Sequence, residues 1–402
     1  MKNWLTRSLA GLAAAFLAAA PAFAEPGDFQ RWLQSFRAEA SAAGISDAVL
    51  DQALTGLTVN PRVYELNDNQ PEFSRGIWDY LDSALSTTRI ENGRAKYNEN
   101  RSLLTLIENA YGVDAEIVAA IWGLESSYGA IMGDYDAIQA LATLAFEGRR
   151  TGYGRSQLIG ALKIIQHGYA ARDELKGSWA GAMGHTQFIP TTYLSYAVDH
   201  DGDGRRDIWN DLGDVFASTA NYLSVSGYRA NELWGLEVIL PQDFDYALAD
   251  NNIKKAAVEW AAGGVEAARG PSILERVDPN MRGRLILPAG ARGPGFLVFE
   301  NFDAILKYNR STAYALAVSL LSEEIAGRSG EVVQTWPRDD RPLSLEERKA
   351  LQQALKDRGF DPGPVDGIIG AGTKRALRAW QKQAGLPADG YASAAMLAAL
   401  TS

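Results

Sequence analysis

The stretch that decides the fold is residues 178–214, SWAGAMGHTQFIPTTYLSYAVDHDGDGRRDIWNDLGD. It begins with a turn rich in glycine and alanine, continues through aromatic and amide side chains, and ends in an acidic loop around Asp199, Asp201 and Asp203. An amphipathic helix requires no such series, because its apolar residues recur every three or four positions. The stretch therefore predicts a turn in which backbone segments approach closely, followed by a cation-binding loop.

The acidic loop matches the spacing of an EF-hand. Positions 1, 3, 5, 6, 7 and 9 of that pattern correspond to Asp199, Asp201, Asp203, Gly204, the Arg205 carbonyl and Asp207. Position 12 is Asn210, which cannot supply the bidentate carboxylate that closes an EF-hand. Oxygen ligands suit Ca²⁺ and would bind Na⁺ weakly, and the alternative is a solvated Asp/Gly turn. We expect a structural cation, bound with modest affinity.

Glu125 is the candidate catalytic residue. The sequence AEIVAAIWGLESSYG predicts a helix with Asp114 as its N-cap and Gly129 as its end. Glu125 then falls in the last turn, on an apolar face with Ile121 and Trp122. The apolar face and the negative end of the helix dipole both disfavour the carboxylate, so we expect a raised pKa. A carboxyl that stays protonated near neutral pH suits a general acid for a glycosidic oxygen, whereas the alternative is a solvated glutamate.

Composition excludes several classes of function. The chain has 402 residues, no cysteine and three histidines, so disulfides and thiol nucleophiles are absent and no His-x-x-x-His spacing supports a zinc hydrolase. No G-x-S-x-G elbow points to a Ser-His-Asp hydrolase. A net charge of −10 opposes binding to nucleic-acid phosphates. For an enzyme, carboxylate chemistry remains.

Residues 1–24 are expected to be a secretory signal peptide. Lys2 and Arg7 precede an apolar run from Leu9 to Ala20. Ala22-Phe23-Ala24 then has the small-x-small pattern of a cleavage site. The run is shorter than the roughly 17–25 residues that span a membrane. Removal of two positive charges would take the net charge from −10 to −12. With no Cys to carry a lipid anchor, we expect an exported, soluble periplasmic protein without a transmembrane segment.

The hydrophobic patterns predict a mainly α (α+β) architecture. The body, residues 25–326, reads as helices except for residues 236–300, which are β-rich. The short β-rich runs are Leu236–Leu240, Arg284–Leu287 and Phe296–Phe299. Residues 327–342 combine glycine, proline and charge without periodicity, which predicts a linker. Residues 343–402 form a small unit with three helical patterns, a size more typical of a binding attachment than of a catalyst.

Two long motifs resemble those of the lytic murein transglycosylase B family. GVDAEIVAAIWGLESSYG (112–129) is similar to the catalytic helix of that family, and SWAGAMGHTQFIPTTYLSYAVDHDGDGRRDIW (178–209) to its most specific signature. The likeness extends over roughly residues 28–325. It implies a lysozyme-like helical core with a small β subdomain. It also implies cleavage of the cell-wall glycan between N-acetylmuramic acid (MurNAc) and N-acetylglucosamine (GlcNAc), which leaves a 1,6-anhydro end.

The resemblance also assigns roles to residues of this sequence. It implies that Glu125 is the single catalytic acid/base. The residues that match polar or aromatic positions around the sugar cleft are Ser178, Gln187, Asn309, Tyr314, Tyr80, Arg149 and Arg150, the last three on spacing alone. The alternatives are turn hydrogen bonds for Ser178 and Gln187, and helix-end polarity or core packing for Asn309 and Tyr314. In the family's variant of the acidic loop a later aspartate closes the cation site, which Asp214 resembles, with Asp211 as a rival.

Residues 345–400 are similar to the peptidoglycan-binding domain type 1, a three-helix unit. The matching marks include Val365-Asp366-Gly367, Trp380-Gln381 and Asp389-Gly390. Trp380 is interpreted as a core residue rather than a ligand contact. The resemblance implies that this unit tethers the body to peptidoglycan glycan strands, which would raise the concentration of substrate at the cleft.

A single carboxyl needs a substitute for the second carboxylate that most glycosidases use. Asp134 and Asp136 are nearest in sequence, and we interpret both as turn residues. The hypothesis is that the substrate's own 2-acetamido group stabilises the oxocarbenium, while Glu125 acts first as acid and then as base. The alternatives are a hydrolytic muramidase and a non-catalytic cell-wall scaffold, which product mass and the activity of Glu125→Gln would separate.

Overall fold

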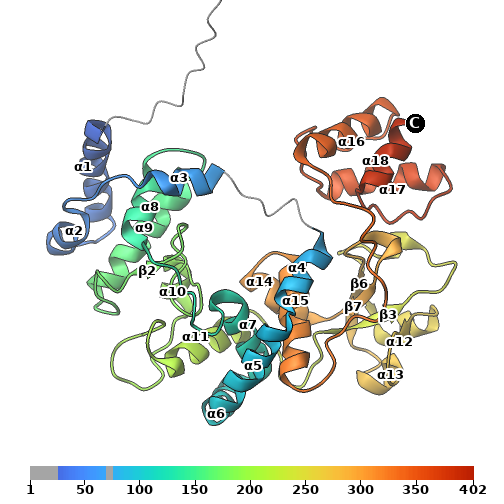
Figure 1. Ribbon diagram of the computed structural model, residues 1–402, viewed down its shortest axis with the longest axis horizontal. Coiled ribbons are helices and arrows are strands. Elements are labelled where there is room, and N and C mark those ends of the chain that lie inside the picture. The colour runs from blue at the N-terminus through green and yellow to red at the C-terminus, as the bar shows by residue number, and fades with distance from the viewer. Residues whose placement is uncertain (1–25, 69–75) are drawn as a thin grey trace, which may run out of the picture.

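A computed structural model describes residues 26–68 and 76–402 (Figure 1). The expected signal peptide, residues 1–24, lies outside the described residues. In the part of the chain that is described, no helix has both the length and the apolar character needed to cross a membrane. The predicted fold class is confirmed, since the chain is mainly helical with small antiparallel sheets and a helical C-terminal domain.

The first part of the body is helical, and its buried residues follow the predicted apolar spacing. In α1, Phe29, Leu33 and Phe36 are all buried, at intervals of three or four residues. They belong to one hydrophobic core that continues through the body. The helices are α1 (Pro26–Ala42), α2 (Asp47–Leu54), α3 (Pro61–Asp68), α4 (Ile77–Ala84), α5 (Thr87–Glu99), α6 (Arg101–Tyr111), α7 (Ala115–Ser126), α8 (Ala137–Phe146), α9 (Thr151–Gln166), α10 (Pro190–Tyr196) and α11 (Leu212–Val225).

Helix α7 runs through the middle of the body (Figure 1). It packs against α5, α6 and α11, and against α15 (Thr312–Ile325), which follows α14 (Glu300–Tyr308) near the end of the body. Every residue from Ile117 to Gly123 is buried. Small residues such as Ala119 and Ala120 let neighbouring helices approach from several sides, so α7 has no solvated face along this length.

Residues 235–298 form the small β subdomain, an antiparallel sheet in the order β4-β6-β7-β3-β5. The three predicted runs are confirmed as the central strands β3 (Gly235–Ile239), β6 (Arg282–Ile286) and β7 (Gly295–Val298). Leu297 lies opposite both Leu236 and Leu285, so apolar side chains meet across the sheet in a second core. The shorter elements are β4 (Lys255–Ala256), α12 (Ala257–Ala262), β5 (Glu266–Ala267) and α13 (Ile273–Arg276). A separate pair, β1 (Tyr135–Asp136) and β2 (Lys176–Gly177), lies in the helical body.

Residues 326–344, which we call the strap, contain neither helix nor strand but are fixed to the body. The backbone N–H groups of Val333 and Gln334 both donate to the Glu237 carboxylate at 2.8 Å. The Trp336 ring stacks on Phe296 at a centroid distance of 6.5 Å. The strap, which includes the predicted linker at residues 327–342, is therefore a segment held along the β subdomain.

The C-terminal domain has its own hydrophobic core, built by α16 (Leu345–Asp357), α17 (Ala371–Gln383) and α18 (Ala394–Thr401). Trp380 belongs to this core, in agreement with its interpretation from the sequence. Two buried glutamines shape the turns that the sequence marks with Asp-Gly. The Gly367 N–H donates to the Gln352 side chain at 2.7 Å, and the Gly390 N–H donates to the Gln381 side chain at 2.8 Å.

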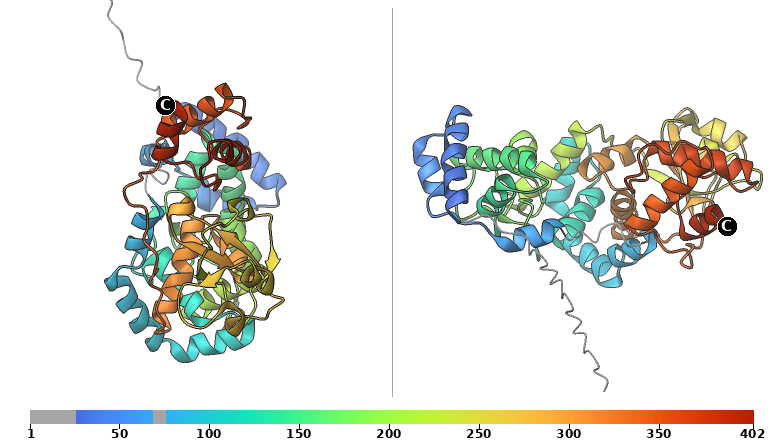
Figure 2. Two further views of the ribbon diagram at one scale, coloured as in Figure 1. Left: turned by 90° about the vertical axis from the view of Figure 1, so that its right-hand side faces the viewer. Right: turned by 90° about the horizontal axis from the view of Figure 1, so that it is seen from above.

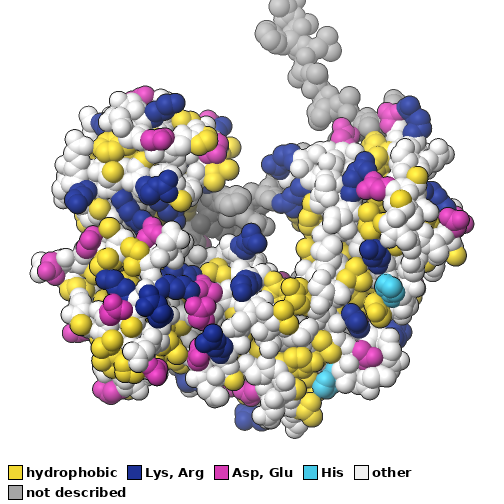
Figure 3. Space-filling model, turned by 180° about the vertical axis from the view of Figure 1, so that it is seen from behind, with side chains coloured by type: hydrophobic (Ala, Val, Ile, Leu, Met, Phe, Trp, Pro, Cys, Tyr) yellow, Lys and Arg dark blue, Asp and Glu magenta, His cyan; other side chains and the backbone are white. Residues whose placement is uncertain are grey.

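The C-terminal domain lies beside the β subdomain, at the end of the molecule opposite α1 and α2 (Figure 2). Arg378 on α17 pairs with Asp250 at 2.7 Å and donates to the Ala249 carbonyl at 2.8 Å. The Ala291 N–H donates to the Asp389 carboxylate at 2.7 Å. Seen from behind, the molecule is hollowed between this end and the N-terminal helices, and Lys and Arg side chains gather beside the hollow (Figure 3).

Candidate active site

Helix α7 places Glu125 one residue before its own end, as the sequence predicts. The helix ends sharply, because Ser127, Tyr128 and Gly129 all have positive φ angles, of 50°, 59° and 87°. The Tyr128 side chain is buried and its hydroxyl donates to the Arg89 carbonyl at 3.0 Å, which holds this unusual backbone in place. The end of α7 is therefore a rigid support for the Glu125 carboxyl.

The N-terminus of α7 differs from its prediction in one respect. Asp114 occupies the N-cap position but makes no capping bond with its side chain. Its carboxylate accepts a hydrogen bond from the Tyr228 hydroxyl at 2.9 Å instead. The long-range partner thus replaces the local one, while the backbone position of the cap is retained.

The Glu125 carboxyl meets a pair of tyrosines from the end of the body. The Tyr314 hydroxyl donates to Glu125 Oε1 at 2.6 Å. Tyr308 stacks parallel to Tyr314, with centroids 6.4 Å apart, and its hydroxyl donates to the Thr186 carbonyl at 2.7 Å. Tyr308 is absent from the predicted site, although it directly precedes Asn309, and the contact between its ring and Tyr314 appears only in the folded chain.

The surroundings of Glu125 favour its protonated form. Burial raises the pKa of Glu125 to about 7, and the hydrogen bond from Tyr314, which favours the carboxylate, opposes only part of that rise. No other carboxylate of the described residues contributes to this shift. Asp136, the nearest candidate for a second carboxyl, caps α8 and pairs with Arg172 at 2.7 Å. The site therefore has one acid with a pKa suited to proton transfer near neutral pH.

Tyr80 lies near this group. Burial and then Glu125 are the larger causes of the raised pKa of Tyr314, and an electrostatic interaction with Tyr80 adds to them. The side chain of Tyr80 is 38% exposed, unlike that of Tyr314, which is buried. An exposed ring beside a half-buried acid offers an apolar face on which a sugar can stack.

Ser178 and Gln187 form the turns that the glycine-rich motif predicts. Ser178 Oγ accepts the Ala182 N–H at 3.1 Å, which leaves its own hydroxyl hydrogen to donate elsewhere. Gln187 has a φ angle of 50°, and its side-chain Nε2 donates to the carbonyls of Met132 and Gly184, both at 2.9 Å. The amide of Gln187 is thus held in one orientation, with its Oε1 available as an acceptor.

The remaining predicted residues have other partners. Arg149 donates to the Asn67 carbonyl at 2.7 Å, and the Arg150 guanidinium lies 5.7 Å above the Trp179 ring. Asn309 is exposed at the C-terminal end of α14. The structure therefore brings Tyr314 to the acid, and places the arginine pair beside Asn67 and Trp179.

His185 is a further residue that the sequence prediction missed. The Trp122 indole N–H donates to His185 Nδ1 at 2.8 Å, so Nε2 carries the hydrogen and donates to the Trp209 carbonyl at 3.1 Å. Burial lowers the pKa of His185, which keeps the ring neutral. The histidine links the turn of α7 before Glu125 to the end of the acidic loop. Its rarity in the sequence and its place in the 178–214 motif are the only local signals for this role.

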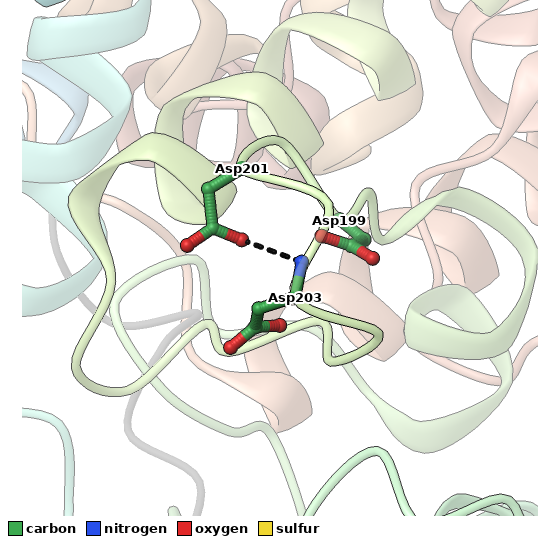
Figure 4. Close-up of side chains that lie close together, drawn as sticks. All are labelled: Asp199, Asp201 and Asp203. Atoms are coloured by element: carbon green, nitrogen blue, oxygen red, sulfur yellow. Dashed lines mark hydrogen bonds between the residues drawn. The ribbon is translucent and has the colours of Figure 1, made fainter.

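The acidic loop brings together three of the predicted metal ligands. The carboxylates of Asp199, Asp201 and Asp203 offer oxygen atoms within 4.8 Å of one another (Figure 4). The Asp199 carboxylate also accepts the N–H groups of Gly202 at 2.7 Å and Gly204 at 2.9 Å, which fixes the curvature of the loop. An all-oxygen donor set of this kind fits a hard cation such as Ca²⁺.

Asp214 and Arg205, the other predicted ligands, complete the frame of the loop. Asp214 is buried, and its two oxygens accept the N–H groups of His200 and Asp207, both at 2.6 Å. These bonds join the beginning of the loop to its end. The Arg205 side chain pairs with Glu174 at 2.9 Å, while the prediction concerns its carbonyl. Asp214 therefore stands beside the three-aspartate cluster, rather than within it.

Comparison with known families and structures agrees with this geometry. The profile described as transglycosylase SLT domain matches residues 28–323, and that of a putative peptidoglycan binding domain matches residues 344–400. The chain is 32% identical to the membrane-bound lytic murein transglycosylase B of Escherichia coli (strain K12) over 281 residues, which are 66% of this chain and 74% of that protein.

Two solved structures extend the comparison. SltB3 from Pseudomonas aeruginosa, in complex with NAG-anhNAM-pentapeptide, is 50% identical, with a TM-score of 0.89 over 93% of this chain and 99% of that chain. The Escherichia coli lytic transglycosylase SLT35, in complex with calcium, is 28% identical, with a TM-score of 0.63 over 76% of this chain and 94% of that chain. Together with the half-buried acid on α7, these matches show that the chain belongs to the transglycosylase SLT domain family and is a lytic transglycosylase of peptidoglycan.

Proposed function

We propose that Glu125 is the only acid/base of this lytic transglycosylase and that it serves both halves of the reaction. The observation that carries the proposal is a single half-buried carboxyl with a pKa of about 7, bonded to Tyr314 at 2.6 Å. Most glycosidases divide the work between two carboxylates. One group with a pKa near the working pH can give a proton in the first step and accept one in the second.

In the first step the protonated Glu125 gives its proton to the oxygen that links MurNAc to GlcNAc. The bond from MurNAc C1 to that oxygen breaks, and GlcNAc leaves with a new hydroxyl. The 2-acetamido oxygen of MurNAc supports the positive charge that develops at C1. Tyr314 donates a hydrogen bond to the new Glu125 carboxylate, which stabilises the charge that the group acquires.

In the second step the Glu125 carboxylate takes the proton from the C6 hydroxyl of MurNAc. The C6 oxygen then bonds to C1, closes the 1,6-anhydro ring and returns Glu125 to its protonated state. The surroundings of Glu125 disfavour a charged carboxylate, so they favour this return. Exclusion of water from the same surroundings favours ring closure over hydrolysis.

The predicted substrate-binding residues take supporting roles in the proposal. The free hydroxyl hydrogen of Ser178 and the Oε1 of Gln187 would bond to sugar amide or hydroxyl groups. The exposed ring of Tyr80 would stack on a sugar face. Asn309, Arg149 and Arg150 would contact other parts of the strand, with Asn309 exposed at the end of α14 and the arginines beside Asn67 and Trp179.

The acidic loop would hold Ca²⁺ as a structural ion. The three-aspartate cluster supports this proposal, and so does the calcium complex of the relative SLT35. Asp199, Asp201 and Asp203 would supply carboxylate oxygens, with the Arg205 carbonyl as a further donor and Asp214 bracing the loop. Bound Ca²⁺ would neutralise the mutual repulsion of the cluster. Na⁺ would be a weaker occupant of the same oxygens.

The protein would act on peptidoglycan outside the cytoplasm, with residues 1–24 as its export signal and residues 343–402 as its peptidoglycan-binding domain. The cleavage pattern of the signal sequence and the substrate class of the family support this location. Export would place the catalytic domain, residues 25–326, in the periplasm, where turnover or remodelling of the cell wall requires such an enzyme.

Digestion of purified cell wall tests the proposed roles. The wild-type protein should release products that end in anhydromuramic acid, which are lighter by one water than hydrolytic products. Glu125→Gln should reduce cleavage by at least about a thousandfold, because no other group of the site supplies the proton. Reducing-end products would indicate a hydrolytic muramidase, and near-normal cleavage by Glu125→Gln would remove Glu125 from the chemistry.

A further inference from the structure

A cavity of about 900 Å³ lies between the C-terminal domain and the body. Gly370, Ala371, Lys374 and Arg375 of the C-terminal domain line one wall. The opposite wall comes from the β subdomain and from α4 and α15, and includes Ile77 and Thr312. Two regions of the protein therefore share this cavity, which we call the interdomain pocket.

The lining of the interdomain pocket has one more cation than carboxylate. The cations are Lys374, Arg375 and Arg378, and the carboxylates are Asp250 and Asp389. The carboxylates in the lining are already engaged, since Asp250 pairs with Arg378 and Asp389 accepts N–H groups from Ala291 and Tyr391. In a chain with a net charge of −10, a cavity lined by three cations and two carboxylates favours an anionic ligand.

The wall formed by α17 adds hydrogen-bond donors to this charge. Its N-cap is Gly370, which has no side chain to bond the first N–H groups of the helix. The helix has 13 residues. Its N-cap Gly370 and its first residue Ala371 line the cavity, so its positive end and these N–H groups lie at the cavity beside Lys374. Lys374 is exposed on this wall, so its ammonium is accessible to a ligand in the cavity.

The pocket lies close to the active site. Ile77 precedes Tyr80 by three residues on α4, and Thr312 precedes Tyr314 by two residues on α15. One helical turn rises about 5.4 Å, so both lining residues lie within one turn of the tyrosines around Glu125. Helices α4 and α15 therefore contribute both to the surroundings of Glu125 and to the lining of this cavity.

We propose that the interdomain pocket binds a carboxylate of the stem peptide on the strand that is being cleaved. This inference rests on the proposed function, because it assumes that the sugars lie at Glu125. The glycan is rich in neutral hydroxyl groups, whereas a stem peptide ends in a carboxylate, which matches Lys374, Arg375 and the start of α17. The C-terminal domain then forms a wall of the substrate site and selects strands that still carry peptides.

The test is a binding measurement without turnover. The parent is the full-length Glu125→Gln protein, and the probe is a soluble GlcNAc-MurNAc-pentapeptide with its carboxylates either free or amidated. Lys374→Gln is the test variant, and Lys382→Gln, an exposed lysine on the same helix α17 that does not line the pocket, is the matched control. Isothermal titration gives the dissociation constants, and thermal unfolding establishes that both variants are folded.

Lys374→Gln should weaken binding of the free-acid probe about five- to tenfold, whereas Lys382→Gln should leave it unchanged. Amidation should weaken binding to the parent by a similar factor, with no further loss in Lys374→Gln. Unchanged affinity of Lys374→Gln for the free acid, or equal losses for both probes, would overturn the inference. Arg375→Gln provides a second substitution if Lys374→Gln unfolds. If the pocket inference fails in this binding test, the proposed role of Glu125 is unaffected. Conversely, cleavage of cell wall by Glu125→Gln would refute that role without changing these affinities.

Discussion

The protonation state of Glu125 determines the pH range in which the first step runs. Only the protonated carboxyl can give its proton to the glycosidic oxygen, and its pKa is raised to about 7. We therefore expect kcat/KM on soluble glycan to fall tenfold per pH unit above about pH 7. A rate profile from pH 5 to 9 measures this limb, and a limb near pH 4.5 would mean that the carboxyl is solvated in the working enzyme.

The hydrogen bond from Tyr314 should influence the pH at which kcat/KM falls on the alkaline side. Its hydrogen bond favours the carboxylate, so Tyr314→Phe should raise the pKa of Glu125 further and shift the alkaline limb to higher pH. Tyr308→Phe is the matched control, because its hydroxyl bonds to the Thr186 carbonyl rather than to Glu125. A limb that shifts downward in Tyr314→Phe, or equally in both variants, would contradict the assignment.

The pH dependence of thermal stability should reveal the raised pKa of Glu125 independently of activity. Well below pH 4.5 the group is protonated in both the folded and the unfolded chain, so burial costs nothing extra. Between pH 4.5 and about 7 the unfolded chain has already released the proton that the folded chain still holds, so the wild type loses stability across this range and loses no more above it. Glu125→Gln removes this loss. Its Tm should match that of the wild type at pH 4 and exceed it by roughly 2–4 °C at pH 8.

Thermal denaturation at the two pH values checks this difference. Glu331→Gln, at an exposed glutamate outside the site, provides the control and should show no such change between pH 4 and pH 8. An equal Tm of Glu125→Gln and wild type at pH 8 would show that ionisation of Glu125 does not destabilise the folded state.

The sequence predicts the acid but only part of its surroundings. The position of Glu125 on α7 follows from local spacing, since Trp122 and the end of the helix are a few residues away. Tyr314 lies 189 residues further along the chain, and only the resemblance to a family pointed to it. Tyr308 and His185 were missed, because their contacts with Tyr314 and Trp122 join elements that no local pattern connects.

At the scale of elements, the acidic loop between α10 and α11 should depend on Ca²⁺. Three carboxylates within 4.8 Å repel one another, and a bound cation would convert that repulsion into stabilisation of the loop. Ca²⁺ at a hundredfold excess over its dissociation constant would add about 2.7 kcal/mol to the free energy of unfolding. We expect Ca²⁺ to raise the Tm of the wild type and EDTA to reverse the rise.

Substitution in the loop makes this expectation specific. Asp201→Asn should abolish the response to Ca²⁺, whereas Asp173→Asn, at an exposed aspartate outside the loop, should keep it. Replacement of Ca²⁺ by Na⁺ at equal ionic strength separates the two candidate ions. A Ca²⁺ response that survives in Asp201→Asn would place the ion elsewhere on the protein.

Elements with a strong local pattern were predicted, and short ones were not. β3, β6 and β7 fall in the predicted β-rich runs, because four or five mostly apolar residues between breakers suffice to mark a strand. β4 and β5 have two residues each, too few for any periodicity, and they form only because β6 and β3 offer backbone partners. The capping bond expected of Asp114 failed for a similar reason, since Tyr228 provides a partner from elsewhere in the chain.

At the scale of the whole molecule, the composition of the strap predicts the absence of helix and strand but not its attachment. Glycine, proline and charge without periodicity exclude regular elements. The contacts that hold the strap come from Glu237 and Phe296 of the β subdomain, about forty to a hundred residues away. The position of the C-terminal domain, and with it the interdomain pocket, therefore depends on tertiary contacts that no segment specifies alone.

Trp336 should be the residue that keeps the strap in place. Its ring lies 6.5 Å from both Phe296 and Trp78, so it joins the strap to the sheet and to α4. Trp336→Ala should make the bond after Arg338 accessible to trypsin and release the C-terminal domain several-fold faster, while unfolding of the body changes little. Val333→Ala, at an exposed side chain of the same segment, should leave the digestion rate unchanged. Equal digestion rates for wild type and Trp336→Ala would show that Arg378 and Asp389 alone fix the domain.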